Sequence, residues 1–290
     1  MLKVRIGIDF GGTKIRAGIV DNNGNIVGKC VSIPTNVSAP KEIIIGNMFA
    51  MIQTLIDGCH DIEIQGIGVG CTGPLDNRNG IILDVCNLPT LNYYPLRECI
   101  ESRFSCKVAI DNDANVFLLG ESLFGSAKEC SSVLGFTLGT GLGCAYVENK
   151  KICHGSHDCT GEIWTSPYKD GIIEDYVSGN GVSQIYKSRT GTTLNTCQIA
   201  DLARKDDKIA REIWNNFSVD LAYLLSWCVN MFDPEMVVIG GSLMKSSDLF
   251  FEEANDKFRK YICKPICDKI SVRSPLLEDD GAVIGAAYLV

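Results

Sequence analysis

Three short runs at the start of the chain alternate apolar and polar residues, and this alternation predicts three neighbouring β-strands. We expect these strands at residues 4–9, 14–20 and 25–33. A glycine-rich turn separates the first strand from the second, and Asn22-Asn23-Gly24 separates the second from the third. Both connections are short enough for hairpins.

Further apolar runs are typical of buried strands and alternate with longer segments of helical periodicity. Strands are expected at 64–71, 106–110 and 234–243, and helices at 39–57, 114–125, 207–231 and 247–262. Residues 132–152 repeat the opening pattern of strand, glycine-rich turn, strand, polar turn and strand. Two copies of one pattern indicate a duplicated half-molecule.

The alternation of strands and helices in two similar halves predicts an α/β protein. We expect two α/β domains that face a cleft, and each domain presents a glycine-rich hairpin to it. The first domain is expected at residues 1–115 and the second at 116–277. The small-residue tail predicts a helix at about 278–290 that packs back on the first domain.

Composition and charge narrow the class of partner. The chain has 290 residues, of which 46% are hydrophobic and 21% charged, and its formal net charge is −8. An acidic chain without a block of Lys or Arg is not expected to bind nucleic acid. We find no signal peptide and no apolar run long enough to span a membrane, so we expect a cytoplasmic protein that acts on small molecules.

The fourteen cysteines are scattered, and no CxxC pair occurs. In a reducing compartment such residues are small buried hydrophobes rather than disulfides or metal ligands. Cys153, His154, His157 and Cys159 lie close together, but their spacing follows no standard zinc pattern. We therefore expect plain thiols.

Three glycine-rich turns follow predicted strands, and each one alone is consistent with simple backbone punctuation. Neither a complete G-x-G-x-x-G sequence nor a G-x-x-x-x-G-K-[ST] loop occurs. Backbone N–H groups in such turns are nevertheless suited to binding an anion such as phosphate. The turns are Gly11-Gly12-Thr13, Gly139-Thr140-Gly141 and Gly240-Gly241.

Seven short motifs occur in the order found in the ROK family of bacterial sugar kinases and related repressors, which the chain resembles from residue 6 to its end. They are D-x-G-G-T at 9–13, GCTGPLD at 70–76, NLP at 87–89, DNDANVFLLGE at 111–121, LGTGLG at 138–143, GEI at 161–163 and DPEMVVIGG at 233–241. The sequence is also similar to glucokinase-like and allose-kinase-like members. The resemblance implies the two-domain actin/hexokinase-like (ribonuclease H-like) ATPase fold, which accounts for the duplicated hairpins.

The resemblance implies a site for ATP and Mg²⁺. Phosphoryl transfer needs mainly positioning and charge neutralisation. The backbone and Thr hydroxyls of the turns at 11–13 and 139–141 would bind phosphates, with Lys14 adding positive charge. Asp9 would act on Mg²⁺ through water. Gly240 and Gly241 would let the adenosine lie against the backbone.

The resemblance also implies a catalytic base, because a sugar hydroxyl must lose its proton as it attacks phosphorus. Asp113 matches the family base, with Asn112 beside it. Helix capping is the structural alternative for the DNDAN sequence, and Asp111 is the better candidate for the cap. The resemblance extends sugar binding to Asn87, Glu162, Glu174 and Gly73, although each Glu alone could be an ordinary surface charge.

One segment departs from the family pattern. Most relatives carry E-x-G-H and a Cys-rich loop that together bind a structural zinc, whereas Ile163-Trp164-Thr165 follows Glu162 here. Neither Cys nor His lies between Glu162 and Glu174, so we expect no zinc, and packing of Trp164 and Tyr168 would hold the segment instead. The shortened loop leaves the role of Glu174 open.

The leading hypothesis is an ATP-dependent hexose kinase that acts on the 6-hydroxyl. Glucose is the default substrate, with allose, fructose, mannose or an N-acylhexosamine as alternatives. A sugar-responsive repressor is disfavoured because the first strand begins within five residues of Met1, before any helix-turn-helix. A catalytically silent sugar-binding or regulatory protein is the remaining alternative. By resemblance we expect a homodimer.

Overall fold

The computed structural model describes residues 1–85 and 87–290, so Cys86 lies outside the described residues. The chain folds into two compact units. Unit 1 contains Met1–Glu129, Val147–Thr160 and Leu276–Val290, and unit 2 contains Cys130–Tyr146 and Gly161–Pro275. The first unit therefore extends beyond residue 115 and takes in a second internal segment.

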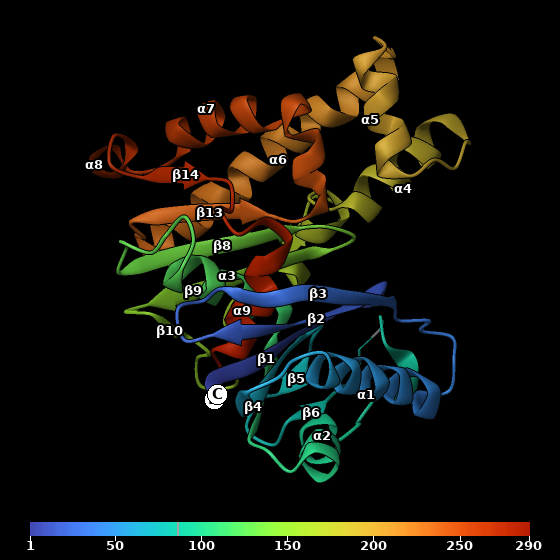
Figure 1. Ribbon diagram of the computed structural model, residues 1–290. Helices are drawn as coiled ribbons and strands as arrows, with labels where there is room; N and C mark the ends of the chain where they lie inside the picture. Colours follow the sequence, from blue (N-terminus) through green and yellow to red (C-terminus); the bar gives the residue numbers. More distant parts are fainter. Residues whose placement is uncertain (86) are drawn as a thin grey trace. The chain divides into compact units, whose positions relative to one another are not determined.

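A five-stranded sheet forms the centre of unit 1, in the order β3-β2-β1-β4-β7 (Figure 1). The first three strands pair antiparallel, whereas β4 lies parallel to β1 and β7 parallel to β4. The three expected opening strands are confirmed. The strands are β1 (Leu2–Phe10), β2 (Lys14–Asp21), β3 (Ile26–Pro34), β4 (Ile62–Cys71) and β7 (Val108–Asn112), and a small hairpin pairs β5 (Leu75–Asp76) with β6 (Ile81–Ile82).

The two faces of this sheet differ because successive side chains of a strand point to opposite sides. On one face Ile6 and Ile8 of β1 are fully buried in a core shared with helices α1 (Lys41–Asp57) and α2 (Leu96–Phe104). On the other face a Cβ atom at Gly7 would lie 1.8 Å from the Val283 carbonyl oxygen. Glycine is required there because a helix backbone passes directly over the strand.

That helix is α9 (Gly281–Ala287), which packs with α3 (Asp113–Leu123) on the glycine face of the sheet. Figure 1 shows α9, in red, beside the blue strands β1 and β2, although almost the whole chain separates them in sequence. A Cβ atom at Gly285 would lie 1.8 Å from the Val116 carbonyl oxygen of α3. The small-residue tail therefore forms a helix packed on unit 1.

Glu121 of α3 fixes the chain that leads into α9. Its side chain is fully buried, and its two carboxylate oxygens accept hydrogen bonds from the backbone N–H groups of Leu276 (3.0 Å) and Leu277 (2.8 Å). The backbone N–H and the hydroxyl of Ser126 also donate to it, at 2.7 and 2.8 Å. A buried carboxylate with four donors is well compensated for its loss of water.

The second large sheet has the order β10-β9-β8-β13-β14. Strand β13 lies parallel to both β8 and β14, and the short β10 pairs antiparallel with the end of β9. A separate hairpin joins β11 to β12. The strands are β8 (Ser132–Leu138), β9 (Leu142–Glu148), β10 (Lys151–Ile152), β11 (Pro167–Tyr168), β12 (Gly171–Ile172), β13 (Met236–Gly240) and β14 (Ser271–Arg273).

Helix α6 (Lys208–Phe232) carries much of the core of unit 2. The rings of Trp214, Phe217 and Phe250 form a cluster whose centroids lie 5.0–5.7 Å apart, and all three side chains are almost completely buried. The other helices of the unit are α4 (Gly179–Thr190), α5 (Thr196–Arg204), α7 (Phe251–Tyr261) and α8 (Lys264–Cys267). Among residues 1–85 and 87–290, no helix is long and apolar enough to cross a membrane.

The long helices expected from periodicity are confirmed, but α2, α4, α5 and α8 were not predicted. Helix α4 begins with Gly179-Asn180-Gly181, and glycine has low helix propensity. Its ends compensate, because the Ser178 hydroxyl accepts a hydrogen bond from Gly181 N–H and Gly191 ends the helix with a left-handed φ of 73°.

Candidate functional site

The first glycine-rich turn joins β1 to β2, and Thr35 holds its backbone. The Gly11 N–H donates to the Lys14 carbonyl (3.1 Å) and closes the turn. The Thr35 N–H donates to the Thr13 carbonyl (3.0 Å), and the Thr35 hydroxyl donates to the Gly11 carbonyl (2.6 Å). Because Thr35 is buried, it fixes the turn from both sides. Sequence reasoning missed Thr35, because one Thr at a strand end forms no motif.

Asp9 and Asp113 lie close enough in unit 1 for their charges to interact. Burial, and next the negative charge of Asp113, raise the pKa of Asp9 to about 6, against the opposing positive charges of Lys14 and Arg16. A partly buried carboxylate beside a second acidic group is suited to a cation, and Mg²⁺ prefers oxygen ligands. The donor chemistry at Asp9 therefore fits the expected Mg²⁺.

The DNDAN sequence forms the junction between β7 and α3, and the cap prediction was wrong in its residue. Asn112, rather than Asp111, is the N-cap: its side-chain oxygen accepts from the Ala114 N–H at 2.9 Å. Asp113 is the first residue of the helix, and its carboxylate also accepts from the Ala114 N–H (2.8 Å). The side-chain amide N–H groups of Asn112 are not used by the cap.

Asp111 instead points into the protein, where it collects several donors. It is 3% exposed, and His154 Nε2 lies 2.6 Å from its Oδ2. Asn115 and Asn77 contribute side-chain amides to its Oδ1, at 2.8 and 3.4 Å. Sequence reasoning missed His154 as a partner of this turn, because the two residues lie 43 positions apart.

The expected sugar-binding residues of unit 1 lie near the carboxyl ends of its parallel strands. Asn112 ends β7, and Gly73 follows the end of β4 and forms a cis peptide with Pro74. Asn87 is exposed and packs on the first glycine turn, because a Cβ atom at Gly12 would lie 3.1 Å from the Asn87 Cβ. Ligands of α/β folds commonly bind at this edge of a parallel sheet.

In unit 2 the second glycine-rich turn joins β8 to β9. Its ends are closed by a hydrogen bond from Gly139 N–H to the Gly141 carbonyl (3.0 Å). The first N–H groups of α4, from Gly179 and Asn180, donate to the Gly139 and Thr140 carbonyls at 2.8 and 3.1 Å. The start of α4 therefore holds the turn by two backbone hydrogen bonds.

Glu174 lies directly against this turn. Its Oε2 accepts a hydrogen bond from the Leu142 N–H at 2.7 Å. A Cβ atom at Gly141 would lie only 2.5 Å from the same oxygen. Burial raises the pKa of Glu174, the bond from Leu142 opposes the rise, and the nearby carboxylates of Asp175 and Glu162 add to it.

Glu162 is thus electrostatically coupled to Glu174 within unit 2. Its Oε2 accepts a hydrogen bond from the indole Nε1–H of Trp164, in the segment where the family pattern is absent. The structure therefore brings the two expected sugar-binding glutamates together with the glycine turn of the same unit. In each of these glutamates, Oε2 already accepts a hydrogen bond from the protein, from Trp164 in Glu162 and from Leu142 in Glu174.

The third glycine-rich turn ends β13. Gly241 has a φ of 94°, and a Cβ atom there would lie 2.3 Å from the Leu138 carbonyl oxygen. The turn therefore passes over Leu138, the last residue of β8, which directly precedes the Gly139–Gly141 turn in the chain. Close backbone approach explains Gly241 structurally, whatever binds next to it.

The segment after Glu162 is held by an ion pair, and Tyr168 packs edge to face against the rings of Tyr176 and Trp227. Lys169 Nζ donates to both carboxylate oxygens of Asp220 at 2.7 and 2.8 Å, and the Tyr168 hydroxyl donates to Oδ1 at 2.9 Å. The Lys169 ammonium lies 4.4 Å from the centre of the Tyr176 ring. In the described part of the chain, no group of three His, Cys, Asp or Glu side chains is arranged to hold a metal ion.

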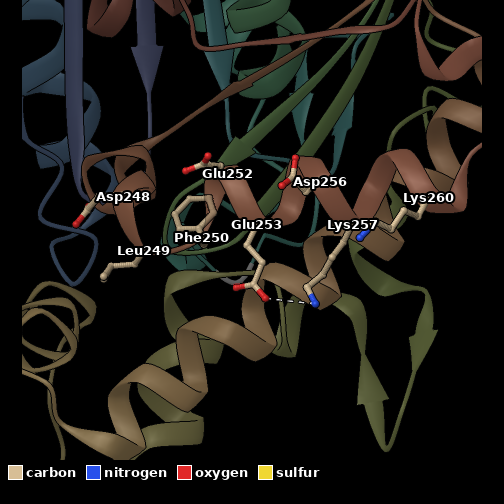
Figure 2. Close-up of a pocket in the computed structure, with 8 residues that line it drawn as sticks. All are labelled: Asp248, Leu249, Phe250, Glu252, Glu253, Asp256, Lys257 and Lys260. Atoms are coloured by element: carbon tan, nitrogen blue, oxygen red, sulfur yellow. Dashed lines mark ion pairs between the residues drawn. The ribbon is translucent and has the colours of Figure 1, made fainter.

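A separate cavity of about 450 Å³ lies at α7 in unit 2 (Figure 2). Acidic and basic side chains line it together, and Lys257 pairs with Glu253 at 3.3 Å. The residues expected to bind sugar or nucleotide lie elsewhere in the chain. Its lining residues are Asp248, Leu249, Phe250, Glu252, Glu253, Asp256, Lys257 and Lys260.

The chain is similar to known proteins over nearly its whole length. The chain is 29% identical to the glucokinase of Thermotoga maritima, over 98% of this chain and 96% of that protein. It is also 29% identical to the N-acetyl-D-glucosamine kinase of Vibrio cholerae, over 98% of both chains.

Solved structures show the same fold. The ROK hexokinase of Thermus thermophilus superposes with a TM-score of 0.85 at 25% identity, covering 99% of this chain and 98% of that one. The ROK glucokinase of Streptomyces griseus, solved with glucose and AMPPNP, gives a TM-score of 0.84 at 24% identity, covering 99% of each. These matches confirm the expected α/β fold class.

The pattern of the ROK family matches residues 5–290, which is nearly the whole chain and includes all seven motifs. The predicted resemblance is confirmed, and the chain belongs to the ROK family.

Proposed function

We propose that this protein transfers the terminal phosphoryl group of ATP to a hydroxyl group of a hexose. The observation that carries the proposal is the pair formed by Asp9 and Asp113, two acidic groups coupled at the carboxyl edge of the sheet in unit 1. Asp9 is suited to bind a cation, and Asp113 is suited to accept a proton. The names of the Thermotoga maritima and Vibrio cholerae relatives support a sugar as the acceptor.

Asp113 accepts the proton of the attacking sugar hydroxyl at its carboxylate while the new O–P bond forms and ADP leaves. Its place at the first turn of α3 fixes the carboxylate on a rigid element. Asn112 uses its oxygen as the helix cap, so its amide N–H groups are left to donate to a sugar oxygen. The further sugar contacts that we propose are Asn87, Gly73, Glu162 and Glu174.

The glycine turns bind the nucleotide. In unit 1 we assign Gly11, Gly12, Thr13 and Lys14 to the phosphates, and in unit 2 Gly139, Thr140 and Gly141. Gly240 and Gly241 would face the adenosine. Mg²⁺, when bound, neutralises phosphate charge, and Asp9 would hold it through water.

The preferred acceptor is the 6-hydroxyl. Glucose is the first candidate, followed by allose, fructose, mannose and N-acylhexosamines, because the Streptomyces griseus relative was solved with glucose and the Vibrio cholerae relative is named for an N-acetylated sugar. The experiment is an ADP-release screen with Mg-ATP over these sugars, with the phosphorylated position determined by NMR. If none of the sugars of the panel gives ADP release, the result would favour a sugar-binding protein without kinase activity.

Asp113→Asn tests the assigned base. We expect kcat to fall by about 10²–10⁴-fold, because general base catalysis contributes that much, while sugar binding measured by calorimetry stays within a few-fold. Asp76→Asn is a matched control, since this Asp of unit 1 bonds within its own turn, to Asn79. Turnover retained in Asp113→Asn would remove the base assignment.

We also propose that the protein contains no structural zinc and forms a homodimer. The Lys169–Asp220 ion pair supports the first proposal, because it anchors the segment that corresponds to the zinc-binding loop expected in most family members. Metal analysis of purified protein and light scattering test the two claims. One zinc ion per chain, or a monomer at micromolar concentration, would contradict them respectively.

A further inference from the structure

Asp111 is a buried acidic residue directly before the proposed catalytic turn, and the proposed chemistry does not use it. Its side chain is 5% exposed, whereas that of His154 is 35% exposed. The donors to Asp111 come from different parts of unit 1: Asn115 in the first turn of α3, Asn77 after β5, and His154 after β10. The carboxylate therefore joins separate segments around the base of the turn.

The two oxygens of Asp111 have different partners. Oδ1 accepts from the Asn112 N–H (2.8 Å) and from the Asn115 amide, which lie inside the turn. Oδ2 has His154 Nε2 at 2.6 Å. His154 is thus the contact that holds the outer oxygen, while the inner oxygen holds the residues next to Asp113.

We infer that His154 is a positioning residue of this kinase: through Asp111 it fixes the orientation of Asn112 and Asp113. The catalytic meaning rests on the proposed function, but the His154–Asp111 pair itself does not. A buried carboxylate that loses one partner must turn toward water or take up a proton. Either change loosens the Oδ1 bonds that hold the turn, and displacement of a reacting group by about 1 Å can cost about 10²-fold in rate.

The local backbone supports a fixed His154. Its carbonyl accepts a hydrogen bond from the Thr160 N–H (3.2 Å), which closes the loop 154–160. The hydrogen bond to Asp111 raises the pKa of His154, the charges of Asp111 and of Asp158 in the same loop add to the rise, and partial burial opposes it. These are the acidic groups that face the ring, one from β7 and one from its own loop.

The first test measures the pair without reference to activity. The chain has three histidines, His60, His154 and His157, so their ring signals can be titrated individually by NMR. The signal missing in His154→Gln identifies His154. We expect its titration midpoint to fall clearly in Asp111→Asn, and to fall much less in Asp158→Asn, whose charge is the smaller contribution. A midpoint that Asp111→Asn leaves unchanged would overturn the pair.

The second test measures the consequence for catalysis. We expect His154→Leu to lower kcat by about 10-fold or more, with the hexose KM within about 3-fold of wild type. The substitution displaces the turn that carries Asp113, whereas the contacts that bind the sugar before reaction remain. His154→Gln should recover most of the loss, since its amide N–H can reach Oδ2. The control is His157→Leu, which removes an exposed His of the same loop and should keep wild-type kcat.

The outcomes separate the inference from the proposed function. Wild-type kcat in a folded His154→Leu protein, or no recovery by Gln, would overturn the positioning role. If His154→Leu does not fold, His154→Gln and Asp111→Asn decide, because the first should keep a kcat near that of wild type and the second should lower it. If the wild-type protein phosphorylates no sugar, the proposed function fails, while the NMR titration still decides whether the pair exists.

Discussion

At the scale of single residues, Asp9 is an acid held in a place that does not favour its charge. Burial and the nearby Asp113 raise its pKa to about 6 from the ordinary 3.8, although Lys14 and Arg16 lower it. Such a group is destabilising in its ionised form unless a cation joins it. Functional acids commonly show this combination of burial and a like charge.

The pH dependence of stability tests this description of Asp9. Because the folded pKa lies above the unfolded one, the folded protein binds this proton more tightly. The contribution of Asp9 is therefore fully present below about pH 4 and is lost as the pH rises through about 6. In EDTA, we expect the Tm of wild type relative to Asp9→Asn to fall between about pH 4 and about pH 7, and thermal melts across this range measure it. Parallel Tm profiles of the two proteins would contradict the assignment.

The sequence predicted which residues stand at the ends of the strands, but not how their side chains are held. D-x-G-G-T and DNDAN follow apolar runs, so their place at the sheet edge was predictable. Thr35 and His154 were not, because each acts through a contact made only in the folded chain. The cap was assigned to Asp111 rather than Asn112, because both residue types cap helices and only tertiary contacts decide between them.

At the scale of elements, the β8–β9 turn and Glu174 form one assembly in unit 2. A Cβ atom at Gly141 would meet the end of the Glu174 side chain, whereas one at Gly139 would have no neighbour nearer than the Ser242 hydroxyl at 3.9 Å. Two glycines of the same turn therefore differ in what they allow. Gly139 leaves open space, and Gly141 leaves room for a carboxylate.

This difference gives a paired prediction. Gly141→Ala should displace the Glu174 carboxylate from the Leu142 N–H. We then expect the loss of one hydrogen bond from the sugar to Glu174, of about 1.4 kcal/mol, which would raise the hexose KM by about 10-fold. Gly139→Ala should leave the hexose KM unchanged. Steady-state kinetics at saturating ATP distinguish the two variants. Equal effects on the hexose KM would show that Glu174 takes no part in sugar binding.

The β11–β12 hairpin is a second element held by a specific contact. Asp220 of α6 is 4% exposed, and Lys169 is its charged partner. We expect Lys169→Met to lower the free energy of unfolding by about 1–3 kcal/mol, because the buried carboxylate then depends on the hydroxyl of Tyr168. Urea unfolding measures the loss, and Lys169→Arg should retain most of the stability. An unchanged midpoint in Lys169→Met would mean that water replaces the ammonium without cost.

At the scale of the whole molecule, unit 1 is assembled from three separated stretches of the chain. The sequence predicted that the C-terminal helix packs on the first domain, and periodicity predicted most of the long elements. It did not predict that residues 147–160 belong with unit 1. This assignment depends on contacts such as His154 with Asp111, which carry no periodic signal.

The packing of α9 makes a prediction for stability. Gly285→Ala would place a methyl group 1.8 Å from a backbone carbonyl of α3, so we expect the free energy of unfolding to fall by about 3 kcal/mol or more. The control is Gly46→Ala in α1, where the added group would meet no atom within 4 Å outside its chain neighbours and the adjacent backbone of its own helix. This control should gain about 0.5–1 kcal/mol from helix propensity. Equal thermal stability of the two variants would contradict the close contact of α9 with α3.

The late position of α9 in the chain has a consequence for biosynthesis. A ribosome makes β1 and β4 first and α9 only after every residue of unit 2, so for most of its synthesis the growing polypeptide has α3 on the glycine face of the sheet but lacks α9 beside it. Unit 2 needs no such late segment and is free to fold earlier. Nascent unit 1 therefore leaves the part of this face around Gly7 and Gly68 open to chaperones and to other nascent chains until translation is almost over.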